Sequence, residues 1–292
     1  MPNRAGLLHA HAQPLRGILL ILLAVVLFSS HDALAKYLVA LYPVVLLAWF
    51  RYLSHTLLLA AALLPRQGLQ VLRSRRPRLQ VLRALCLLGI SLLFVSGLRF
   101  VPLAEATAVI FLAPLLVTAL SVLLLGERVS RVQWLAVIAG FIGVLIIVRP
   151  GGALFTPAIL WPMAAALCFA CYQLLTREVN QYDSPATSNF LAGLINTTLV
   201  SVLLPFFWVA APWPHMLMML ALGVIGMLAH QLLTHAFRYA APAMLAPFSY
   251  GQIIFAGLFS WLLFGHVPDP LALLGMALIV AGGLSIALSQ RH

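Results

Sequence analysis

The sequence predicts an all-α polytopic membrane protein, with ten transmembrane helices arranged as two inverted five-helix repeats. The prediction rests on an apolar composition, a series of long apolar runs and an internal repeat. Hydrophobic residues make up 63% of the 292 residues and charged residues 8%, whereas soluble domains have roughly 45–50% and about 25%. A chain of this composition cannot bury its apolar side chains in one aqueous core, so a lipid bilayer is its expected surroundings.

The apolar runs have the length of membrane spans. About 20 residues of α-helix, at about 1.5 Å per residue, cross the roughly 30 Å hydrocarbon layer. The predicted helices cover residues 17–39, 42–64, 81–101, 104–125, 132–149, 157–177, 187–210, 216–238, 241–264 and 270–289. The links are short and contain proline and glycine, so consecutive helices are expected to be antiparallel neighbours. The first run also resembles a signal peptide. Its counterpart lies mid-chain, which favours a spanning helix.

The chain repeats itself after about 140 residues. A shift of 139 places Arg99 on Arg238, Ser121 on Ser260 and Gly126 on Gly265 without a gap, and a shift of 141 places Lys36 on Arg177. We therefore divide the chain into an N-terminal tail (1–16), a first repeat (17–149) and a second repeat (150–292). Five helices per repeat is an odd number, so the repeats must be inverted, as in secondary transporters that bind substrate near the midplane.

The distribution of basic residues predicts the orientation. With the N-terminus inside, most of them fall on the inner side, and only Lys36, Arg99 and Arg149 fall outside. The inner set is Arg4, Arg16, Arg66, Arg73, Arg75, Arg76, Arg78, Arg83, Arg128, Arg131, Arg177, Arg238 and Arg291. The positive-inside rule then places both termini in the cytoplasm. We attribute the net charge of +11 to topology and contact with anionic lipid, and expect no nucleic-acid partner.

Residues 104–148 begin with AEA, continue as an apolar run through Pro114, contain LLLGE at 123–127 and end in a glycine-rich helix. With these features the segment resembles the repeat of the EamA family in the drug/metabolite transporter superfamily. Residues 42–43 (Tyr-Pro) and 50–52 (Phe-Arg-Tyr) are similar to the family's second helix. The resemblance implies a ten-helix fold, a cavity lined mainly by helices one, three, four, six, eight and nine, and transport of small metabolites, usually outward. The second repeat departs from the pattern at His266 and Pro247.

Two charged residues are expected near the membrane midplane. Arg51 and Asp32 lie nine or ten residues from the turn between the first two predicted helices, so they share a depth. A charge there costs several kcal/mol unless it is paired or solvated. With His31 and His55 they can form a patch that receives a charged substrate or a proton. The alternatives are a structural Arg51–Asp32 ion pair, or a helical pair of Asp32 with Lys36.

The second repeat offers polar residues at a similar depth. His230 and Gln231 should face Ser249, Tyr250 and Gln252 across a turn, whereas Tyr172 and Gln173 match His31 and Asp32 under the 141-residue shift. Such groups can bind a small polar molecule within an apolar site. The predicted substrate-binding set is Asp32, Arg51, Tyr172, Gln173, His230, Gln231 and Tyr250. Proton coupling is assigned to Asp32, His31 or His230. We expect Arg99, Glu105 and Glu127 to be interfacial and Pro114 and Pro247 to kink their helices.

The absence of nucleotide-binding, catalytic and metal-binding motifs narrows the range of possible functions. The chain has no GxxxxGK[ST] loop for ATP, no HExxH motif, no paired catalytic carboxylates and no metal-binding pattern among its three cysteines. We predict no catalytic residue, metal or cofactor, and an intramembrane enzyme using His31, Asp32 and His230 is a remote alternative. The sequence does not specify an oligomeric state.

The favoured function is a secondary transporter of the bacterial inner membrane that works by alternating access. It would export a small anionic or zwitterionic metabolite, such as an amino acid, an amino-acid-derived carboxylate or an opine-type metallophore, either facilitated or exchanged for protons. The alternative is uptake of a cofactor-like metabolite such as riboflavin or S-adenosylmethionine. Residues 30–36 (SHDALAK) resemble family members associated with such imports.

Overall fold

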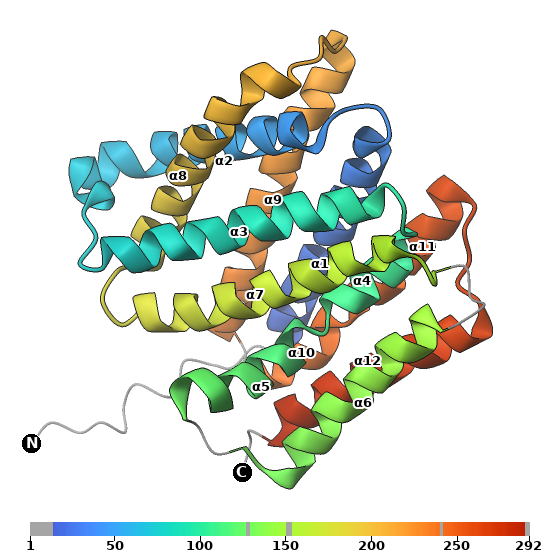
Figure 1. Cartoon of the computed structure of the whole chain (residues 1–292). Helices are drawn as coiled ribbons and strands as arrows, with labels where there is room; N and C mark the ends of the chain where they lie inside the picture. Colours follow the sequence, from blue (N-terminus) through green and yellow to red (C-terminus); the bar gives the residue numbers. More distant parts are fainter. Residues whose placement is uncertain (1–13, 127–128, 150–153, 240–241, 290–292) are drawn as a thin grey trace, which may run out of the picture.

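The computed structural model describes residues 14–126, 129–149, 154–239 and 242–289, which form helices and links with no strand in these ranges (Figure 1). Two short 3-10 helices, η2 (Gly68–Leu72) and η3 (Pro157–Ile159), precede α3 and α7. The α-helices are α1 (Pro14–Val39), α2 (Val44–Gln67), α3 (Pro77–Leu98), α4 (Leu103–Ile110), α5 (Ala113–Leu125), α6 (Arg131–Val148), α7 (Leu160–Val179), α8 (Pro185–Phe207), α9 (Trp213–Tyr239), α10 (Pro242–Ser249), α11 (Gly251–Phe264) and α12 (Pro270–Ser289).

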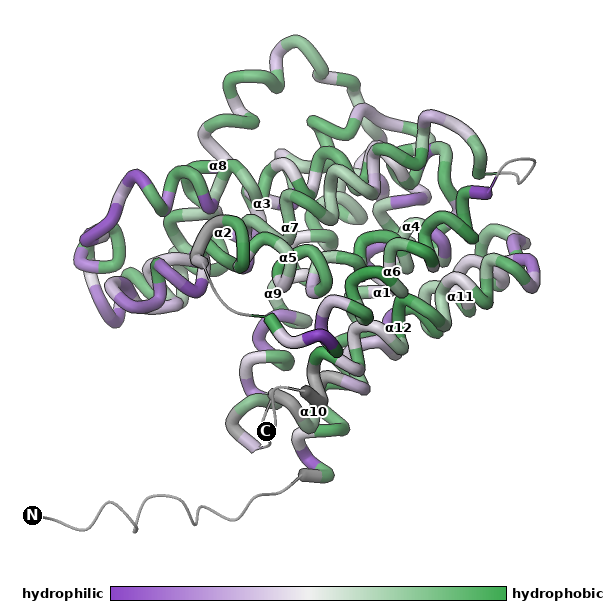
Figure 2. Tube along the Cα trace, turned by 60° about the horizontal axis from the view of Figure 1, so that its bottom comes forward, coloured by the Kyte–Doolittle hydropathy of each residue, from purple (hydrophilic) through white to green (hydrophobic). Residues whose placement is uncertain are grey.

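The all-helical, polytopic character predicted from the sequence is confirmed. Nine segments of the described residues, from Leu15–Val39 to Pro247–Phe264, are long and apolar enough to cross a membrane, and Pro270–Ile286 is a shorter apolar helix. Hydrophobic residues run along the helices, and hydrophilic residues collect in links such as the one between α2 and α3 (Figure 2). The count of ten spans and the cytoplasmic termini remain predictions.

Two of the predicted spans are broken near their middle. The span expected at 104–125 divides into α4 and α5 around Phe111, and the span expected at 241–264 divides into α10 and α11 at Tyr250. α4 ends at Ile110, whose carbonyl would accept the N–H that Pro114 lacks. Pro247 instead lies inside α10, three residues before its break. Both breaks fall at the same position of the 139-residue register.

The ends of α5 and α11 also match in that register. Gly126 and Gly265 cap them with φ of 65° and 66°. This left-handed conformation is open to glycine without a Cβ penalty. The same residue at the same register position therefore ends both helices in the same way.

Helices from the two halves of the chain pack against each other. α6 lies along α12 (Figure 1), where small residues let the backbones approach: a Cβ on Gly143 would lie 2.6 Å from the carbonyl oxygen of Gly275. α1 packs on α9, α3 on α7 and α2 on α8. Of these helices, α2, α3, α7, α8 and α9 enclose the candidate site.

Candidate functional site

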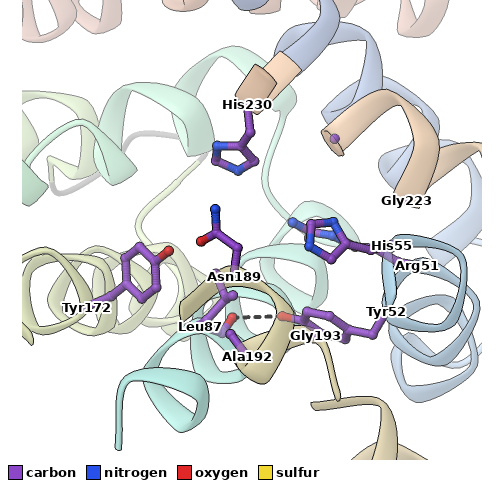
Figure 3. Close-up of a pocket in the computed structure, with 11 residues that line it drawn as sticks. Arg51, Tyr52, His55, Leu87, Tyr172, Asn189, Ala192, Gly193, Gly223 and His230 are labelled. Atoms are coloured by element: carbon purple, nitrogen blue, oxygen red, sulfur yellow. Dashed lines mark hydrogen bonds between the residues drawn. The ribbon is translucent and has the colours of Figure 1, made fainter. Parts of the chain in front are cut away.

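A small polar cavity lies between α2, α3, α7, α8 and α9, with a volume of about 70 Å³. It is lined by Arg51, Tyr52, His55, Leu87, Tyr172, Asn189, Ala192, Gly193, Gly223, Gly226 and His230. Figure 3 shows the side chains of Arg51, His55, Tyr172, Asn189 and His230 directed toward one space. The cavity therefore brings together three residues of the predicted binding set, namely Arg51, Tyr172 and His230.

Arg51 lies on α2 and points between the helices. Its Nη1 donates a hydrogen bond to the Ser91 hydroxyl on α3 at 3.2 Å, and its guanidinium lies 5.6 Å from the Tyr52 ring centre. The Tyr52 hydroxyl contacts Ser91 Oγ at 2.6 Å and donates to the Leu87 carbonyl at 3.0 Å. Arg51 also lines a second hollow of only about 10 Å³ beside His31. Arg51 thus lies between the cavity and this smaller hollow.

The Arg51–Asp32 ion pair considered from the sequence does not form. Asp32 Oδ1 is hydrogen-bonded to His31 Nδ1 at 3.0 Å, and Asp32 Oδ2 accepts a hydrogen bond from Gln252 Nε2 at 3.1 Å. Ser29 on α1 completes this link to α11 by donating to the Gln252 carbonyl at 3.1 Å. Depth along the helices placed Asp32 and Arg51 at one level, but the rotation of α1 directs Asp32 to α11. Asp32 does not pair with Lys36 either, because the Lys36 ammonium binds the Leu98 and Val101 carbonyls.

Arg83 is a functional candidate that the sequence analysis counted only as an inner, topology-setting charge. α3 begins at Pro77, four residues before the predicted start, so Arg83 lies inside the bundle with 2% of its surface exposed. Its guanidinium donates to Thr176 Oγ1 (2.7 Å), the Ser188 carbonyl (2.9 Å), the Tyr172 hydroxyl (2.7 Å) and Asn189 Oδ1 (3.1 Å). All four acceptors are neutral, and Tyr172 and Asn189 line the cavity.

The charges around the cavity are of one sign. Arg51 lines it, Arg83 lies directly behind Tyr172 and Asn189, and both cations are within electrostatic reach of His230. No aspartate or glutamate is among its described lining residues. In surroundings of low dielectric, unpaired positive charge attracts anions strongly. The arrangement is thus suited to a carboxylate or a similar anionic group.

Other residues of the predicted set lie away from this cavity. Gln173 and Gln231 are not among its lining residues. Tyr250 is buried at the α10–α11 break, where its ring centre is 5.2 Å from that of Phe111. His31 lines the second hollow, and its Nε2 is buried without a hydrogen-bond partner among the described residues.

Sequence reasoning also missed Asn189 and Ser91. The internal repeat could have indicated Ser91, because the 139-residue shift aligns Ser91 with His230. Asn189 is the fifth residue of α8 and lies near the start of the segment predicted at 187–210. No local sequence pattern distinguishes it from the other polar residues near helix ends.

Comparison with known proteins identifies the family. The model of the EamA-like transporter family matches the chain twice, over residues 15–149 and 156–288. The chain belongs to the EamA-like transporter family. The resemblance noted in the sequence is thereby confirmed, and the alternative of an intramembrane enzyme is set aside because the family and the named relatives are transporters.

Several relatives of this EamA-like chain have named cargoes. An S-adenosylmethionine uptake transporter of Rickettsia prowazekii is 27% identical, with 95% of this chain and 94% of the relative covered. A riboflavin transporter of Vibrio cholerae is 30% identical (94% and 92% covered), and a pseudopaline exporter of Pseudomonas aeruginosa is 30% identical (94% and 97%). A crystal structure that is 25% identical aligns with a TM-score of 0.65, covering 94% of this chain and 97% of the other. The chain is therefore a small-molecule transporter embedded in a membrane.

Proposed function

We propose that this EamA-like transporter exports a small anionic or zwitterionic metabolite across the bacterial inner membrane by alternating access. The observation that carries the proposal is the cavity in which Arg51, His55 and His230 converge with no acidic residue among the described lining residues. The cargo would bring the missing negative charge.

Arg51 is the group proposed to bind that charge. A guanidinium has five N–H donors in a planar fork that matches a carboxylate, and Arg51 shows one side-chain hydrogen bond, to Ser91. Arg83 donates four hydrogen bonds to protein groups, so its proposed role is to hold Tyr172 and Asn189 in place and to add positive potential. His55, His230, Tyr172 and Asn189 would bind the polar remainder of the cargo.

Asn189 lies near the start of α8, the end of that helix predicted to be cytoplasmic, and is exposed. The hollow on the other side of Arg51 has only about 10 Å³. This difference supports entry of the cargo from the predicted cytoplasmic end. The cavity volume of about 70 Å³ is well below the roughly 300 Å³ at which ligand sites begin. The helices would therefore have to separate further to admit a metabolite.

The second candidate function is uptake of a cofactor-like metabolite. It is favoured by the similarity to relatives named for S-adenosylmethionine uptake and for riboflavin. Those relatives and the named exporter have similar identities to this chain, so the names alone do not choose between the two directions. Proton coupling through Asp32, His31 or His230 remains a prediction under either direction.

Metabolite profiling tests the direction and the cargo together. Medium and cell extract from a deletion strain would be compared with those of the same strain carrying the wild-type gene or the Arg51→Gln variant. Export predicts one compound that accumulates in deletion cells and disappears from their medium, with Arg51→Gln behaving like the deletion. A compound that remains in the medium would instead support uptake. A cationic cargo, or full rescue by Arg51→Gln, would contradict the proposed site.

A further inference from the structure

Glu105 is a buried carboxylate that lies outside the lining of the cavity. It lies in the first turn of α4, three residues after Pro102, and only 3% of its side chain is exposed. Acidic residues at a helix end normally reach water, and the sequence analysis expected the same of Glu105. A carboxylate removed from water requires partners or a proton.

One carboxylate oxygen of Glu105 has a partner from the other half of the chain. Glu105 Oε1 is 2.7 Å from Nε2 of His266, which lies in the link between α11 and α12 and is partly exposed. Glu105 Oε2 is buried without a hydrogen-bond partner among the described residues. Glu105 Oε2 can therefore accept a proton.

Lys36 on α1 supplies a second attraction. Its ammonium donates to the carbonyls of Leu98 (2.6 Å) and Val101 (2.9 Å) after α3, lies 5.5 Å from the Phe264 ring centre and interacts electrostatically with Glu105. The Glu105 carboxylate therefore contacts His266 on the α11–α12 link and attracts the Lys36 ammonium on α1. These contacts join the two halves at the end of the bundle that the sequence predicts to be outside.

We propose that Glu105 is a proton-binding site whose protonation weakens the contact between α4 and the α11–α12 link and so opens the outer end. At neutral outer pH the ionised carboxylate holds His266 and attracts Lys36. When the outer pH falls, a proton on Glu105 removes the charge on which both attractions depend. The proposal rests on alternating access but not on the identity or direction of the cargo.

The remaining charged groups at this end do not duplicate that response. Arg99 is exposed after α3, and Asp269 is paired with Arg149 at 3.0 Å. Hydrogen bonds from the Ala272 N–H and from Arg149 hold the pKa of the exposed Asp269 below its ordinary value, so this carboxylate stays ionised as the outer pH falls from 8 to 5.

The Glu105–His266 pair has no equivalent at the opposite end of the repeat. The 139-residue shift places Met244 on Glu105 and Glu127 on His266, and Glu127 lies outside the described residues. In an inverted repeat, the corresponding contact belongs to the opposite membrane face. Since methionine cannot titrate, the acid–histidine pair is present at the predicted outer end and not at the inner one.

Cysteine accessibility tests the proposal without knowledge of the cargo. Ala48 lines the closed hollow next to Arg51 and is 4% exposed, so Ala48→Cys in a background of Cys86→Ala, Cys168→Ala and Cys171→Ala reports opening of that half. Intact cells would be treated with a membrane-impermeant maleimide at outer pH values from 5 to 8. Phe100→Cys, at a position 64% exposed, corrects for the pH dependence of the thiol reaction itself.

The proposal expects corrected labelling at position 48 to rise as the outer pH falls. Glu105→Gln should give high labelling at every pH, about tenfold above the wild-type value at pH 8, as expected for loss of one charged hydrogen bond. His266→Gln, which can still donate to Glu105, should retain the pH response, and so should the control Asp269→Asn. Labelling that is independent of pH in the wild-type background, or an unchanged pH profile in Glu105→Gln, would overturn the proposal. If Glu105→Gln fails to fold, His266→Ala should raise labelling while keeping the pH response, and unchanged labelling there would also overturn it.

Discussion

The rings of Phe111 and Tyr250 contact each other with centres 5.2 Å apart, and the two residues are separated by the 139-residue interval of the repeat. Each marks the point where its helix breaks, so equivalent residues of the two halves meet at one place. Aromatic contacts of this kind contribute about 0.5–1.5 kcal/mol beyond burial. We expect Phe111→Ala and Tyr250→Ala to show a coupling of that size in a double-mutant cycle. Thermal unfolding of the detergent-solubilised protein measures it, and additive effects would show that the contact is not stabilising.

Replacing Arg51 should reduce transport about tenfold or more while leaving the fold intact. Arg51→Gln removes the cavity's charged fork, and the loss of one charged hydrogen bond of about 1.5–3 kcal/mol corresponds to a decrease of about tenfold or more. Arg66→Gln is the matched control, because Arg66 is an exposed arginine in the last turn of the same helix. Transport would be measured by recovery of export in the deletion strain. Equal effects of the two variants would argue against a specific role for Arg51.

Arg83 should matter for stability as well as transport. Arg83→Met would leave the acceptors on Tyr172 and Thr176 without their donor, each at a cost of about 1–3 kcal/mol if water does not replace it. We expect a large decrease in thermal stability, whereas Tyr172→Phe, which removes one of these acceptors together with its contact, should cost less. The thermal midpoint of each purified variant decides between them. Comparable midpoints would mean that water replaces the Arg83 network.

Acid should loosen the link between the start of α3 and the α7–α8 connection. Burial acts to raise the pKa of Asp183, but hydrogen bonds from Ser74, from the Arg75 N–H (2.9 Å) and from Gln80 (2.9 Å) outweigh it and hold the pKa below the ordinary value of 3.8. A depressed pKa contributes stability that is present above the ordinary value and is lost as the pH falls through the folded-state value.

Comparison with Asp183→Asn isolates this effect. The wild-type protein should lose stability more steeply than Asp183→Asn as the pH falls below about 4, because the variant has no proton to bind at this position. Unfolding midpoints measured from pH 6 downward in detergent provide the comparison. Parallel curves for the two proteins would show that Asp183 does not contribute to acid sensitivity.

The contact between α6 and α12 should tolerate no added side chain. A Cβ on Gly143 would be 2.6 Å from the Gly275 carbonyl oxygen, whereas one on Gly257 would meet nothing within 4 Å. Gly143→Ala should therefore be destabilising by about 1–3 kcal/mol through overpacking, and Gly257→Ala should not. Thermal unfolding of both variants tests the difference. A stable Gly143→Ala protein would show that the two helices can separate without cost.

The helices and their order follow from the sequence because hydrophobic length is a local property. A run of about 20 apolar residues is long enough to span the bilayer wherever it occurs, and the predicted ranges differ from the observed ones by a few residues at their ends. The breaks were only partly predictable. Pro114 explains the end of α4 at Ile110, but the break at Tyr250 follows Pro247 by three residues.

The candidate site depended on information that the sequence does not contain. Depth in the membrane can be counted in residues from the end of a helix, and this count predicts similar depths for Arg51, Asp32 and His230. Rotation of each helix about its axis is set by packing against several partners at once. It directed Asp32 to Gln252 and Arg51 to Ser91, and it turned Arg83 from a topology-setting charge into a buried group.

The sequence by itself determined a membrane protein of two related halves, because composition, run length and a repeat of fixed register are all linear properties. Tertiary structure alone decided which polar residues meet: Arg83 with Tyr172, and Glu105 with His266. The physical reason is that each pair lies on different helices, whose relative rotation and tilt result from the packing of the whole bundle.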